Sequence, residues 1–337
     1  MNRVADKFNR PLRDLRISVT DQCNFRCSYC MPKEIFGPDY AFLPKGAMLS
    51  NEEIIFATRS FAKLGVKKIR LTGGEPLLRP DLSELIAGIA NDTGIEDISL
   101  TTNASLLPRY AQKLKDAGLK RINISLDSLD TERFAQMSGG RSSPEAVLRG
   151  IDAAEKAGLP IKINMVAKLG VNEMDVLPMV NYFRERRITL RFIEFMDVGE
   201  TNGWKMDQVI PAKQILETIG SRYEFEPVDP DYRGEVASRY RFTDTGSEFG
   251  IITSITNPFC GNCNRARLSA QGKLYTCLFA TAGTDLKKRI RDGIDQEEFT
   301  NFVSKLWISR DDQYSEDRSN GKALNGTKKV EMSYIGG

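Results

Sequence analysis

The sequence repeats a strand pattern followed by a helix pattern six times between about residues 15 and 196. The stretches that read as strands are residues 15–20, 68–72, 97–101, 121–126, 161–167 and 188–194. Helix signals separate them: Ser50 and Glu53 can form a capping box, and Gly65 follows an apolar helix face. This alternation predicts an α/β fold with a parallel sheet and right-handed crossovers. Periodicity alone leaves a doubly wound sheet and a barrel both open.

Parallel α/β folds place their chemistry at the carboxyl ends of the strands. We therefore expect every motif discussed below to lie near such an end. Beyond Met196 the pattern loosens into what reads as loops and a less regular region, with helical stretches again between about residues 286 and 307. We expect two parts, a core of residues 1–235 and a carboxyl-terminal region of residues 236–337.

The composition excludes several classes of function. The chain has 337 residues, no histidine and a net charge of only +3, from 48 Lys and Arg against 45 Asp and Glu. Without histidine there is no Ser-His or Cys-His catalysis and no common zinc hydrolase site. A nucleic-acid partner would favour a basic excess, and no apolar stretch approaches the ~18 residues of a membrane span. We expect a cytoplasmic protein with reduced thiols that binds neither nucleic acid nor membrane.

Cys23, Cys27 and Cys30 form a Cys-x3-Cys-x2-Cys run directly after the first strand pattern. Three thiols within eight residues cannot all pair as disulfides. A zinc site would want a fourth ligand, and the chain has no histidine to supply one. An iron–sulfur cluster accepts thiolates alone, and with three of them it keeps one iron open for a small molecule. Three structural thiols are the plain alternative.

A second triplet consists of Cys260, Cys263 and Cys277. A zinc site meets the same missing fourth ligand here, and free structural cysteines are again the plain alternative. Arg265 and Arg267 follow Cys263 at alternate positions. Guanidinium groups suit phosphate oxygens, so this basic pair favours an anionic substrate beside the second triplet.

The first triplet, with Tyr29 just before its last cysteine, resembles the signature of the radical S-adenosylmethionine (SAM) superfamily. The turn at residues 73–76, Gly-Gly-Glu-Pro, follows the second strand pattern as in that superfamily. With the second triplet and residues 332–337 added, the chain resembles the GTP 3',8-cyclase family over nearly its whole length. The resemblance implies a partial (βα)6 TIM-type barrel with a carboxyl-terminal extension that carries a second cluster. Ala104 departs from the pattern, because glycine is expected there in many relatives.

The resemblance also implies the cofactors and the site residues. It implies two 4Fe-4S clusters, one on Cys23, Cys27 and Cys30 that binds SAM, and one on Cys260, Cys263 and Cys277 that binds GTP. The implied SAM contacts are Tyr29, Gly74, Ser125 and Met196, with core packing as the alternative for Met196. The implied GTP contacts are Arg16, Lys68, Arg70, Thr101, Lys162, Arg265, Ala266 and Arg267. Gly336 and Gly337 are implied to enter the active site in a supporting catalytic role.

In the family, an electron delivered to the first cluster cleaves SAM to methionine and a 5'-deoxyadenosyl radical. The radical removes the 3' hydrogen of GTP, and the ribose carbon attacks C8 of guanine. The implied product is (8S)-3',8-cyclo-7,8-dihydroguanosine 5'-triphosphate, the first intermediate of molybdenum cofactor biosynthesis. The implied partners are GTP, SAM, an electron donor and a downstream cyclic pyranopterin synthase that acts on the product; a homodimer is left open.

Two competing hypotheses stay open at this point. A peptide-modifying radical SAM enzyme would hold auxiliary clusters on its carboxyl-terminal cysteines, although such extensions usually carry more than three. A non-catalytic iron–sulfur carrier or a zinc-stabilised nucleic-acid module belongs to another class of protein. A carrier has little use for six strand–helix units, and a nucleic-acid module would usually show a basic excess.

Overall fold

The computed structural model describes residues 4–232, 234–322 and 328–336 of the chain. Within these residues, twelve strands form one sheet in the order β12-β11-β10-β1-β2-β3-β4-β5-β6-β9-β8-β7. Its six central strands are mutually parallel. They are β1 (Asp14–Ser18), β2 (Lys68–Thr72), β3 (Asp97–Thr102), β4 (Arg121–Ser125), β5 (Ile161–Ala167) and β6 (Thr189–Glu194). The predicted six strands and their parallel pairing are thus confirmed.

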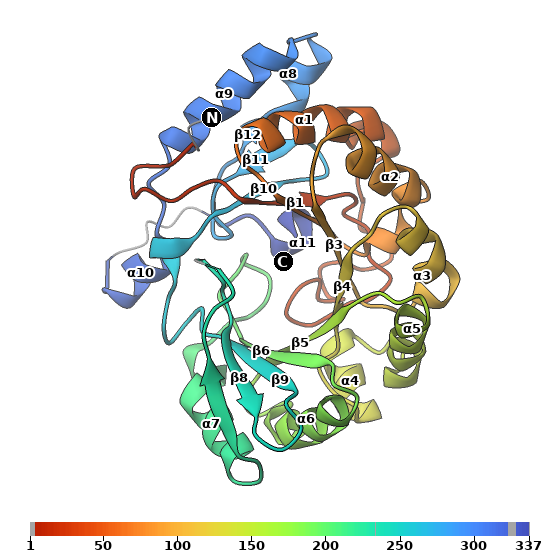
Figure 1. Ribbon diagram of the computed structural model, residues 1–337, viewed down its shortest axis with the longest axis vertical. Helices are drawn as coiled ribbons and strands as arrows, with labels where there is room; N and C mark the ends of the chain where they lie inside the picture. The colour runs from red at the N-terminus through yellow and green to blue at the C-terminus, as the bar shows by residue number, and fades with distance from the viewer. Residues whose placement is uncertain (1–3, 233, 323–327, 337) are drawn as a thin grey trace.

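The sheet curves around a central space, and helices lie on its outer side (Figure 1). This is the partial barrel that the sequence resemblance implied. The helices that connect the central strands are α1 (Asn51–Lys63), α2 (Leu82–Asp92), α3 (Leu107–Asp116), α4 (Thr131–Ser138), α5 (Pro144–Lys156) and α6 (Val176–Glu185). The later helices are α7 (Ala212–Gly220), α8 (Lys287–Arg291), α9 (Gln296–Ile308), α10 (Tyr314–Ser319) and α11 (Met332–Ile335).

The carboxyl-terminal part of the chain extends both edges of the same sheet. At one edge, β9 (Glu248–Ile252) pairs parallel with β6, and β8 (Ser238–Phe242) and β7 (Phe225–Val228) follow antiparallel. At the other edge, β10 (Arg265–Leu268) pairs parallel with β1, and β11 (Lys273–Tyr275) and β12 (Thr284–Asp285) follow antiparallel. The boundary near residue 235 stays a prediction, since strands on both sides of it share one sheet.

The structure corrects two expectations. The region beyond Met196 contains α7 and three strands, β7 to β9, that the sequence reading treated as loops and less regular chain. The second error concerns the second cysteine triplet, which does not lie at the carboxyl ends of the parallel strands. Because β10 runs parallel to β1 and pairs Arg265 with Asp14, the residues just before Arg265 lie at the amino ends.

Local sequence signals explain several element boundaries. The Ser50 side chain accepts a hydrogen bond from Glu53 N, and the Glu53 carboxylate accepts one from Ser50 N, so the predicted capping box starts α1. Gly65 has a φ of 108° just after the helix, where a residue without a side chain is favoured. Apolar side chains on the inner faces of the helices, such as Phe61, are fully buried against the strands. Packing of these faces closes the barrel wall.

Ala104 lies on the loop after β3 with a φ of 63°, and it is fully buried. This is a conformation in which glycine is the usual residue, in agreement with the glycine expected there. The peptide carbonyl of Ala104 also lies 2.1 Å from the position that a Cβ on Gly150 would occupy. The loop after β3 and helix α5 are therefore in close contact at this point. Separately, no helix among the described residues is long and apolar enough to cross a membrane.

Candidate active site

A cavity of about 220 Å³ runs through the barrel between the two cysteine triplets. At one end it is lined by Tyr29, which precedes Cys30. At the other end it is lined by Cys260, Cys263 and Cys277. The predicted site residues that line it are Arg16, Tyr29, Arg70, Thr101, Ser125, Met196, Cys260, Cys263, Arg265, Arg267 and Cys277. The structure therefore brings most of the predicted SAM and GTP contacts to one enclosed space.

The first triplet lies on the loop that leaves the carboxyl end of β1. Its backbone is held by Arg26, whose Nη1 donates to the carbonyls of Cys23 and Phe25, both at 2.7 Å. The loop also turns on itself, since Cys30 N donates to the Cys27 carbonyl at 3.0 Å. These contacts arrange three thiols on one compact turn.

The Gly73-Gly74 turn after β2 packs directly against the chain that leads into this loop. Gly74 N donates to the Thr20 carbonyl at 2.9 Å, and a Cβ on Gly74 would lie 2.1 Å from the Gln22 carbonyl. Only glycine fits so close an approach of two backbones. The Gly74 N–H is thus used within the protein, which leaves its carbonyl as the backbone group open to a ligand.

Glu75, the next residue, ties the strand ends together. Its carboxylate accepts hydrogen bonds from Leu77 N at 3.0 Å, the Thr102 hydroxyl at 2.7 Å and Asn103 N at 2.8 Å. Burial raises its pKa to about 7, against the effect of these donors. The Gly-Gly-Glu-Pro turn thus fixes the cysteine loop relative to β2 and β3.

Burial makes the first three thiols hard to ionise in the absence of a metal. Burial, with the Glu75 carboxylate second, raises the pKa of Cys23 to about 12. Burial and the neighbouring thiolates raise the pKa of Cys27, and burial, Cys23 and Glu331 raise that of Cys30 to about 12. Cys27 and Cys30 both sense the charge of Cys23, as cluster ligands grouped around one site must. Thiolates at this site need a bound cation to offset their charge.

The predicted SAM contacts lie beside this loop. The Tyr29 hydroxyl donates to Asp127 Oδ2 at 2.9 Å, and Val166 N donates to Asp127 Oδ1 at 2.9 Å. Ser125 ends β4 and lines the cavity with Met196, which is partly exposed to it. Asp127 also lines the cavity, and sequence reasoning did not single it out. A signal for Asp127 was available in the sequence, because it is a carboxylate two residues after Ser125, a predicted SAM contact.

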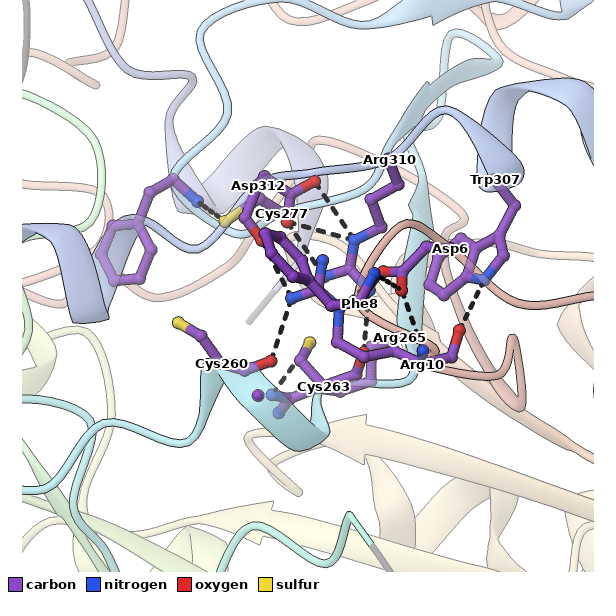
Figure 2. A network of polar contacts seen from close by, with 12 residues as sticks. Asp6, Phe8, Arg10, Cys260, Cys263, Arg265, Cys277, Trp307, Arg310 and Asp312 are labelled. Atoms are coloured by element: carbon purple, nitrogen blue, oxygen red, sulfur yellow. Dashed lines mark hydrogen bonds and ion pairs between the residues drawn. The ribbon is translucent and has the colours of Figure 1, made fainter.

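The second triplet is built from two separate pieces of chain. Cys260 and Cys263 belong to a short 3-10 turn (Cys260–Asn262) and the residue after it, and Cys263 N donates to the Cys260 carbonyl at 3.0 Å. Cys277 follows β11, whose antiparallel pairing with β10 returns the chain to the same end of the barrel. Figure 2 shows the three cysteines with arginine side chains beside them.

Arginines change the electrostatics of this second group. Arg265 Nη2 donates to Cys263 Sγ at 3.4 Å. Although burial opposes ionisation, the guanidinium groups of Arg265 and Arg310 lower the pKa of Cys263 to about 6. Burial, with the Asp312 carboxylate second, raises the pKa of Cys277 to about 12, and burial raises that of Cys260. At least one of these thiols is thus a thiolate at neutral pH.

Buried arginines crowd the middle of the cavity. Arg16, Arg70 and Arg191 are each less than a tenth exposed, and their Nε atoms have no hydrogen-bond partner among the described residues. Burial, then the neighbouring Arg70 and Arg267, lowers the pKa of Arg16 well below its ordinary value. Thr101 Oγ1 is likewise buried without a partner in the described part of the chain. Such groups are costly to bury unless a ligand satisfies them.

Arg191 is a cavity residue that sequence reasoning did not assign to a ligand. It projects from β6, its Nη2 donates to Asn123 Oδ1, and burial and then Arg70 lower its pKa to about 9. One signal for it is visible in the sequence, an arginine in the middle of an otherwise apolar strand pattern. Arg16 and Arg70 carry the same signal, and the family resemblance implied them as GTP contacts.

A second cavity of about 220 Å³ adjoins the first at the amino ends of the strands. It contains Lys68 and Lys162, two of the predicted GTP contacts, and shares Arg16, Arg70 and Arg191 with the main cavity. Burial lowers the pKa of Lys68 to about 8 and also lowers that of Lys162. By contrast, Ala266 is fully buried in β10 as part of the apolar core, and the structure does not place it in either cavity.

The end of the chain enters the barrel, and α11 lies at the centre of the ring of strands (Figure 1). Gly336 has a φ of 72°, and a Cβ there would lie 2.2 Å from Thr72 Cγ2. Arg267 Nη1 donates to the Gly336 carbonyl. The tail therefore touches both β2 and β10. Gly337, the second predicted tail residue, lies outside the described residues.

Contacts further back hold this tail in place. The Glu331 carboxylate accepts from Glu200 N at 3.0 Å and from the Thr201 hydroxyl at 2.8 Å. Lys329 Nζ donates to the Asp197 carbonyl at 2.6 Å, and it also pairs with the Asp197 carboxylate at 3.2 Å. The loop after β6, which carries Met196, thus anchors the segment that leads to Gly336.

The donor sets fit iron–sulfur clusters. Among the described residues, no three His, Cys, Asp or Glu side chains gather closely enough to hold a single metal ion. The fit therefore depends on the donors themselves: six free cysteines in two groups of three, all partly buried. Soft thiolates in enclosed sites are the ligands that iron–sulfur clusters take. Cys23, Cys27 and Cys30 would hold one group, and Cys260, Cys263 and Cys277 the other.

Comparison with protein families divides the chain into two consecutive matches. Residues 17–183 match the family described as Radical SAM superfamily. Residues 188–316 match the family described as Molybdenum Cofactor Synthesis C. The first match contains Cys23, Cys27 and Cys30, and the second contains Cys260, Cys263 and Cys277.

Among curated proteins, the chain is 50% identical to the GTP 3',8-cyclase of Staphylococcus haemolyticus (strain JCSC1435), over 99% of each chain. It is 49% identical to the GTP 3',8-cyclase of Staphylococcus aureus (strain MRSA252), over 100% of each chain. Among solved structures, Streptococcus suis SuiB bound to S-adenosylmethionine superposes with a TM-score of 0.63 at 14% identity, over 95% of this chain and 71% of SuiB. That likeness concerns the fold alone.

Proposed function

The chain belongs to the GTP 3',8-cyclase family of the radical SAM superfamily, and from this membership we propose that it converts GTP to (8S)-3',8-cyclo-7,8-dihydroguanosine 5'-triphosphate. This is the first step of molybdenum cofactor biosynthesis. Full-length identity near 50% to curated cyclases supports this assignment, as does the order of the two family matches. The protein is therefore a radical SAM enzyme rather than an electron carrier or a nucleic-acid module.

One observation carries the choice of a nucleotide triphosphate as substrate. Arg16, Arg70 and Arg191 meet inside the barrel with buried Nε atoms that no described residue satisfies. A triphosphate has several anionic oxygens that accept hydrogen bonds from guanidinium groups, often two at a time. Lys68 and Lys162 continue the cationic surface toward the amino ends of the strands. We assign these five side chains to the triphosphate.

We assign SAM to the carboxyl-terminal side of the cavity. When bound on Cys23, Cys27 and Cys30, a reduced cluster supplies the electron that cleaves SAM and leaves a 5'-deoxyadenosyl radical. The protein's task is to orient SAM through the Gly74 carbonyl, Ser125 and Met196 and to keep water away from the reacting atoms. Tyr29 closes this side, because its hydroxyl is fixed on the buried Asp127 carboxylate.

We assign the guanine end of GTP to the second triplet. Arg265 contacts Cys263 and Arg267 pairs with Arg16 in the sheet, so we infer that the purine and the triphosphate are bound at separate points. Thr101, with its unpartnered buried hydroxyl, is placed to contact the nucleotide between them. The Gly336 carbonyl, bound by Arg267, brings the tail next to the same ligand. Gly336, at the end of this tail, has no side chain and therefore fits this restricted space.

The test is anaerobic turnover of the reconstituted protein with SAM, a reductant and GTP. Mass analysis should reveal a nucleotide of the same mass as GTP whose ribose and C8 are joined, together with methionine and 5'-deoxyadenosine. ATP serves as the matched control, since it carries the same triphosphate on another base. SAM cleavage that responds to peptides and ignores GTP would contradict the proposal and favour the peptide-modifying alternative.

The remaining partners are part of the same proposal. An electron donor must supply two electrons per turnover, one that reduces the first cluster for SAM cleavage and one that, with a proton, reduces the cyclised nucleotide radical, and a cyclic pyranopterin synthase would take up the product. A cytoplasmic location and a homodimer remain predictions for this chain. Sedimentation of the reconstituted protein, with and without GTP, measures its oligomeric state directly.

A further inference from the structure

A network of buried charged groups lies behind the second cysteine triplet (Figure 2). It joins three distant segments: the amino-terminal residues Asp6 and Arg10, the triplet itself, and Arg310 and Asp312 just after α9. Trp307, on the last turn of α9, donates from Nε1 to the Arg10 carbonyl at 3.0 Å. The proposed function uses none of the five residues outside the triplet, which are Asp6, Arg10, Trp307, Arg310 and Asp312.

Two arginines in this network grip the backbone of the cysteines. Arg10 Nη1 donates to the Cys260 carbonyl at 2.9 Å, and Arg310 Nη1 donates to the Cys263 carbonyl at 2.8 Å. The backbone carbonyl of each cysteine in the Cys-x2-Cys turn therefore accepts a hydrogen bond from a different guanidinium group. Because a carbonyl fixes the peptide plane that follows its Cα, these bonds restrict the directions in which the two thiols project.

Carboxylates hold the arginines in turn. Arg10 Nε donates to Asp6 Oδ2 at 2.5 Å, and Arg310 Nη1 lies 3.5 Å from the same oxygen. Arg310 Nη2 pairs with Asp312 Oδ1 at 3.0 Å, and Arg10 Nη1 also donates to the Asp312 carbonyl at 2.9 Å. Shared hydrogen bonds and ion pairs to Asp6 and Asp312 thus join the two arginines into one unit.

Three of the four charged side chains in this unit are almost completely removed from water, and the fourth, Asp312, is 26% exposed. The side chains of Asp6, Arg10 and Arg310 are 0%, 2% and 1% exposed. With Arg265 included, three guanidinium groups face two carboxylates, so the group carries a net charge of +1 beside the triplet. Buried ion pairs contribute little net stability compared with apolar side chains of similar size, so stability alone is a weak reason for this arrangement.

A net positive charge next to an iron–sulfur cluster has a defined effect. Reduction adds one electron to the cluster, so a nearby fixed cation stabilises the reduced form more than the oxidised form. Groups behind the direct ligands are also known to set ligand orientation in metal sites. The same side chains are positioned here for both effects.

We propose that Arg10 and Arg310 are positioning residues for the second cluster, which hold Cys260 and Cys263 in ligating orientation and raise the cluster's reduction potential. The proposal rests on the proposed second cluster. Asp312 acts in the opposite sense, because its carboxylate pairs with Arg310 at the edge of the cavity and offsets part of its charge. Arg310 and Asp312 should therefore shift the potential in opposite directions when each is neutralised.

The experiment uses the full-length chain with Cys23, Cys27 and Cys30 all changed to alanine, so that only the second triplet can hold a cluster. This parent is reconstituted anaerobically, its iron and sulfide are counted, and its potential is measured by a redox titration followed by electron paramagnetic resonance. Into it are introduced Arg310→Gln, Arg310→Lys and Asp312→Asn. Arg59→Gln is the matched control, since Arg59 is a half-exposed arginine paired with Asp92 on the outer face.

We expect R310Q to move the potential to more negative values and D312N to move it to more positive values. R310K should lie closer to the parent than R310Q does, because it keeps the charge but not the full set of hydrogen bonds. R59Q should leave the potential and the iron content unchanged. Shifts in opposite directions for R310Q and D312N would support the proposal. A merely structural role would not predict a direction for either shift.

Loss of the cluster is also informative. If R310Q binds markedly less iron while R310K retains it, the positioning role is supported, and D312N then measures the charge effect alone. Potentials that stay at the parent value in D312N and in whichever Arg310 variant retains iron would overturn the proposal. A parent without iron at the second triplet would instead contradict the second cluster itself, which separates the two failures.

Discussion

The two cysteine triplets use the same ligand chemistry in opposite electrostatic surroundings. The first lies on one loop at the carboxyl ends of the parallel strands, near the carboxylates of Glu75 and Asp127. The second is assembled from two segments at the amino ends, among Arg265, Arg310 and other guanidinium groups. Burial and neighbouring negative charge raise the pKa of every thiol in the first triplet, whereas arginines lower the pKa of Cys263 to about 6.

This difference explains how one barrel can divide two tasks. An environment poor in cations lowers the reduction potential of a cluster, which suits an electron donor to SAM. An environment rich in cations suits a site that binds an anionic nucleotide. The cavity between them lets a radical formed on one side reach a substrate held from the other. The comparison therefore predicts that changes at the two triplets will not be equivalent.

The largest expected difference comes from removing one ligand on each side. Cys27→Ala should abolish cleavage of SAM, because the first cluster can no longer assemble on three thiolates. Cys263→Ala should leave SAM cleavage at a reduced or unproductive level while cyclised nucleotide is lost. The measurements are 5'-deoxyadenosine and cyclised product, quantified by mass spectrometry in anaerobic reactions.

Iron content provides the control for this pair of variants. We expect about eight irons per chain in the parent and about four in each variant, since each cubane cluster has four. Equal loss of SAM cleavage in both variants, with four irons retained in each, would show that the triplets do not divide the work as proposed. Stoichiometric zinc in anoxic protein would contradict both clusters.

The second largest effect is expected at the tail, which bridges the two sides. Deleting Gly336 and Gly337 should lower formation of cyclised product on the order of 100-fold, with iron content and GTP binding unchanged, because misplacement near the reacting atoms costs rate rather than affinity. Gly336→Ala should act in the same direction, since its methyl group would lie 2.2 Å from Thr72 Cγ2.

Gly246→Ala is the matched control for the tail substitution. Gly246 has a φ of 67°, close to the 72° of Gly336, but a Cβ there would meet nothing within 4 Å. Both alanines would have a positive φ, but the one at residue 336 would also be crowded and would have a ψ of 137°, outside the left-handed helical region, so the larger loss is expected there. Product formation at the parent rate in the deletion variant would mean that the tail has no catalytic role.

The central fold could be predicted from the sequence because its signals are local. The strand at residues 68–72 and the capping box of α1 were predicted at their observed positions, since each depends on neighbouring side chains. The strands β7 to β9 were missed because each has only four or five residues, so that pairing with the finished sheet decides their conformation. Strand pairing between distant segments leaves no local pattern to read.

The site residues could be predicted from the sequence where the residue type and its spacing indicate the ligand. Cysteine spacing identified both triplets, and the family resemblance identified Arg16 and Arg70. The position of the second triplet was mispredicted, because the parallel pairing of β10 with β1 joins residues about 250 positions apart. No sequence signal indicated that Arg10 and Arg310 would meet Cys260 and Cys263, since that contact exists only after the chain ends come together.

A smaller effect is expected from the arginine next to the second triplet. Arg265→Ala should weaken GTP binding by about 1.5–3 kcal/mol, roughly 10- to 150-fold, if a hydrogen bond to a charged group is lost. SAM binding should be unchanged, because Arg265 lies on the other side of the cavity from Tyr29. Equilibrium dialysis under anaerobic conditions measures both affinities, and Arg59→Ala serves as the exposed control. Unchanged GTP affinity in R265A would show that Arg265 does not bind the substrate and contacts only the second triplet.

Arg267 is a poorer choice for that test. Its guanidinium donates to the Gly336 carbonyl, so Arg267→Ala would change the tail and the substrate site together. A larger loss of product than of GTP affinity in R267A would reflect the tail contact. The comparison with R265A therefore separates binding from the catalytic step.

The smallest effect is a pH dependence at the amino ends of the strands. Burial, then the nearby Arg121 guanidinium, lowers the pKa of Lys68 to about 8, and its Nζ donates to the Tyr232 hydroxyl at 3.1 Å. The lowered pKa means that the ammonium charge is present below about pH 8 and is lost in the free protein above it. GTP phosphates are already fully ionised in this range. The contribution of Lys68 to GTP binding should therefore be present below pH 8 and decline as the pH rises above it.

We expect the decline to be about 1 kcal/mol, roughly fivefold in Kd between pH 7.5 and 9.5, because Lys68 is only partly buried and water screens its charge. Lys68→Arg should flatten the profile, since a guanidinium keeps its charge throughout this range. Lys305→Arg, on the distant helix α9, should keep the pH profile of the parent and serves as the matched control. Identical pH profiles for the parent and K68R would show that Lys68 does not contact the triphosphate. The buried arginines would then be the residues that bind it.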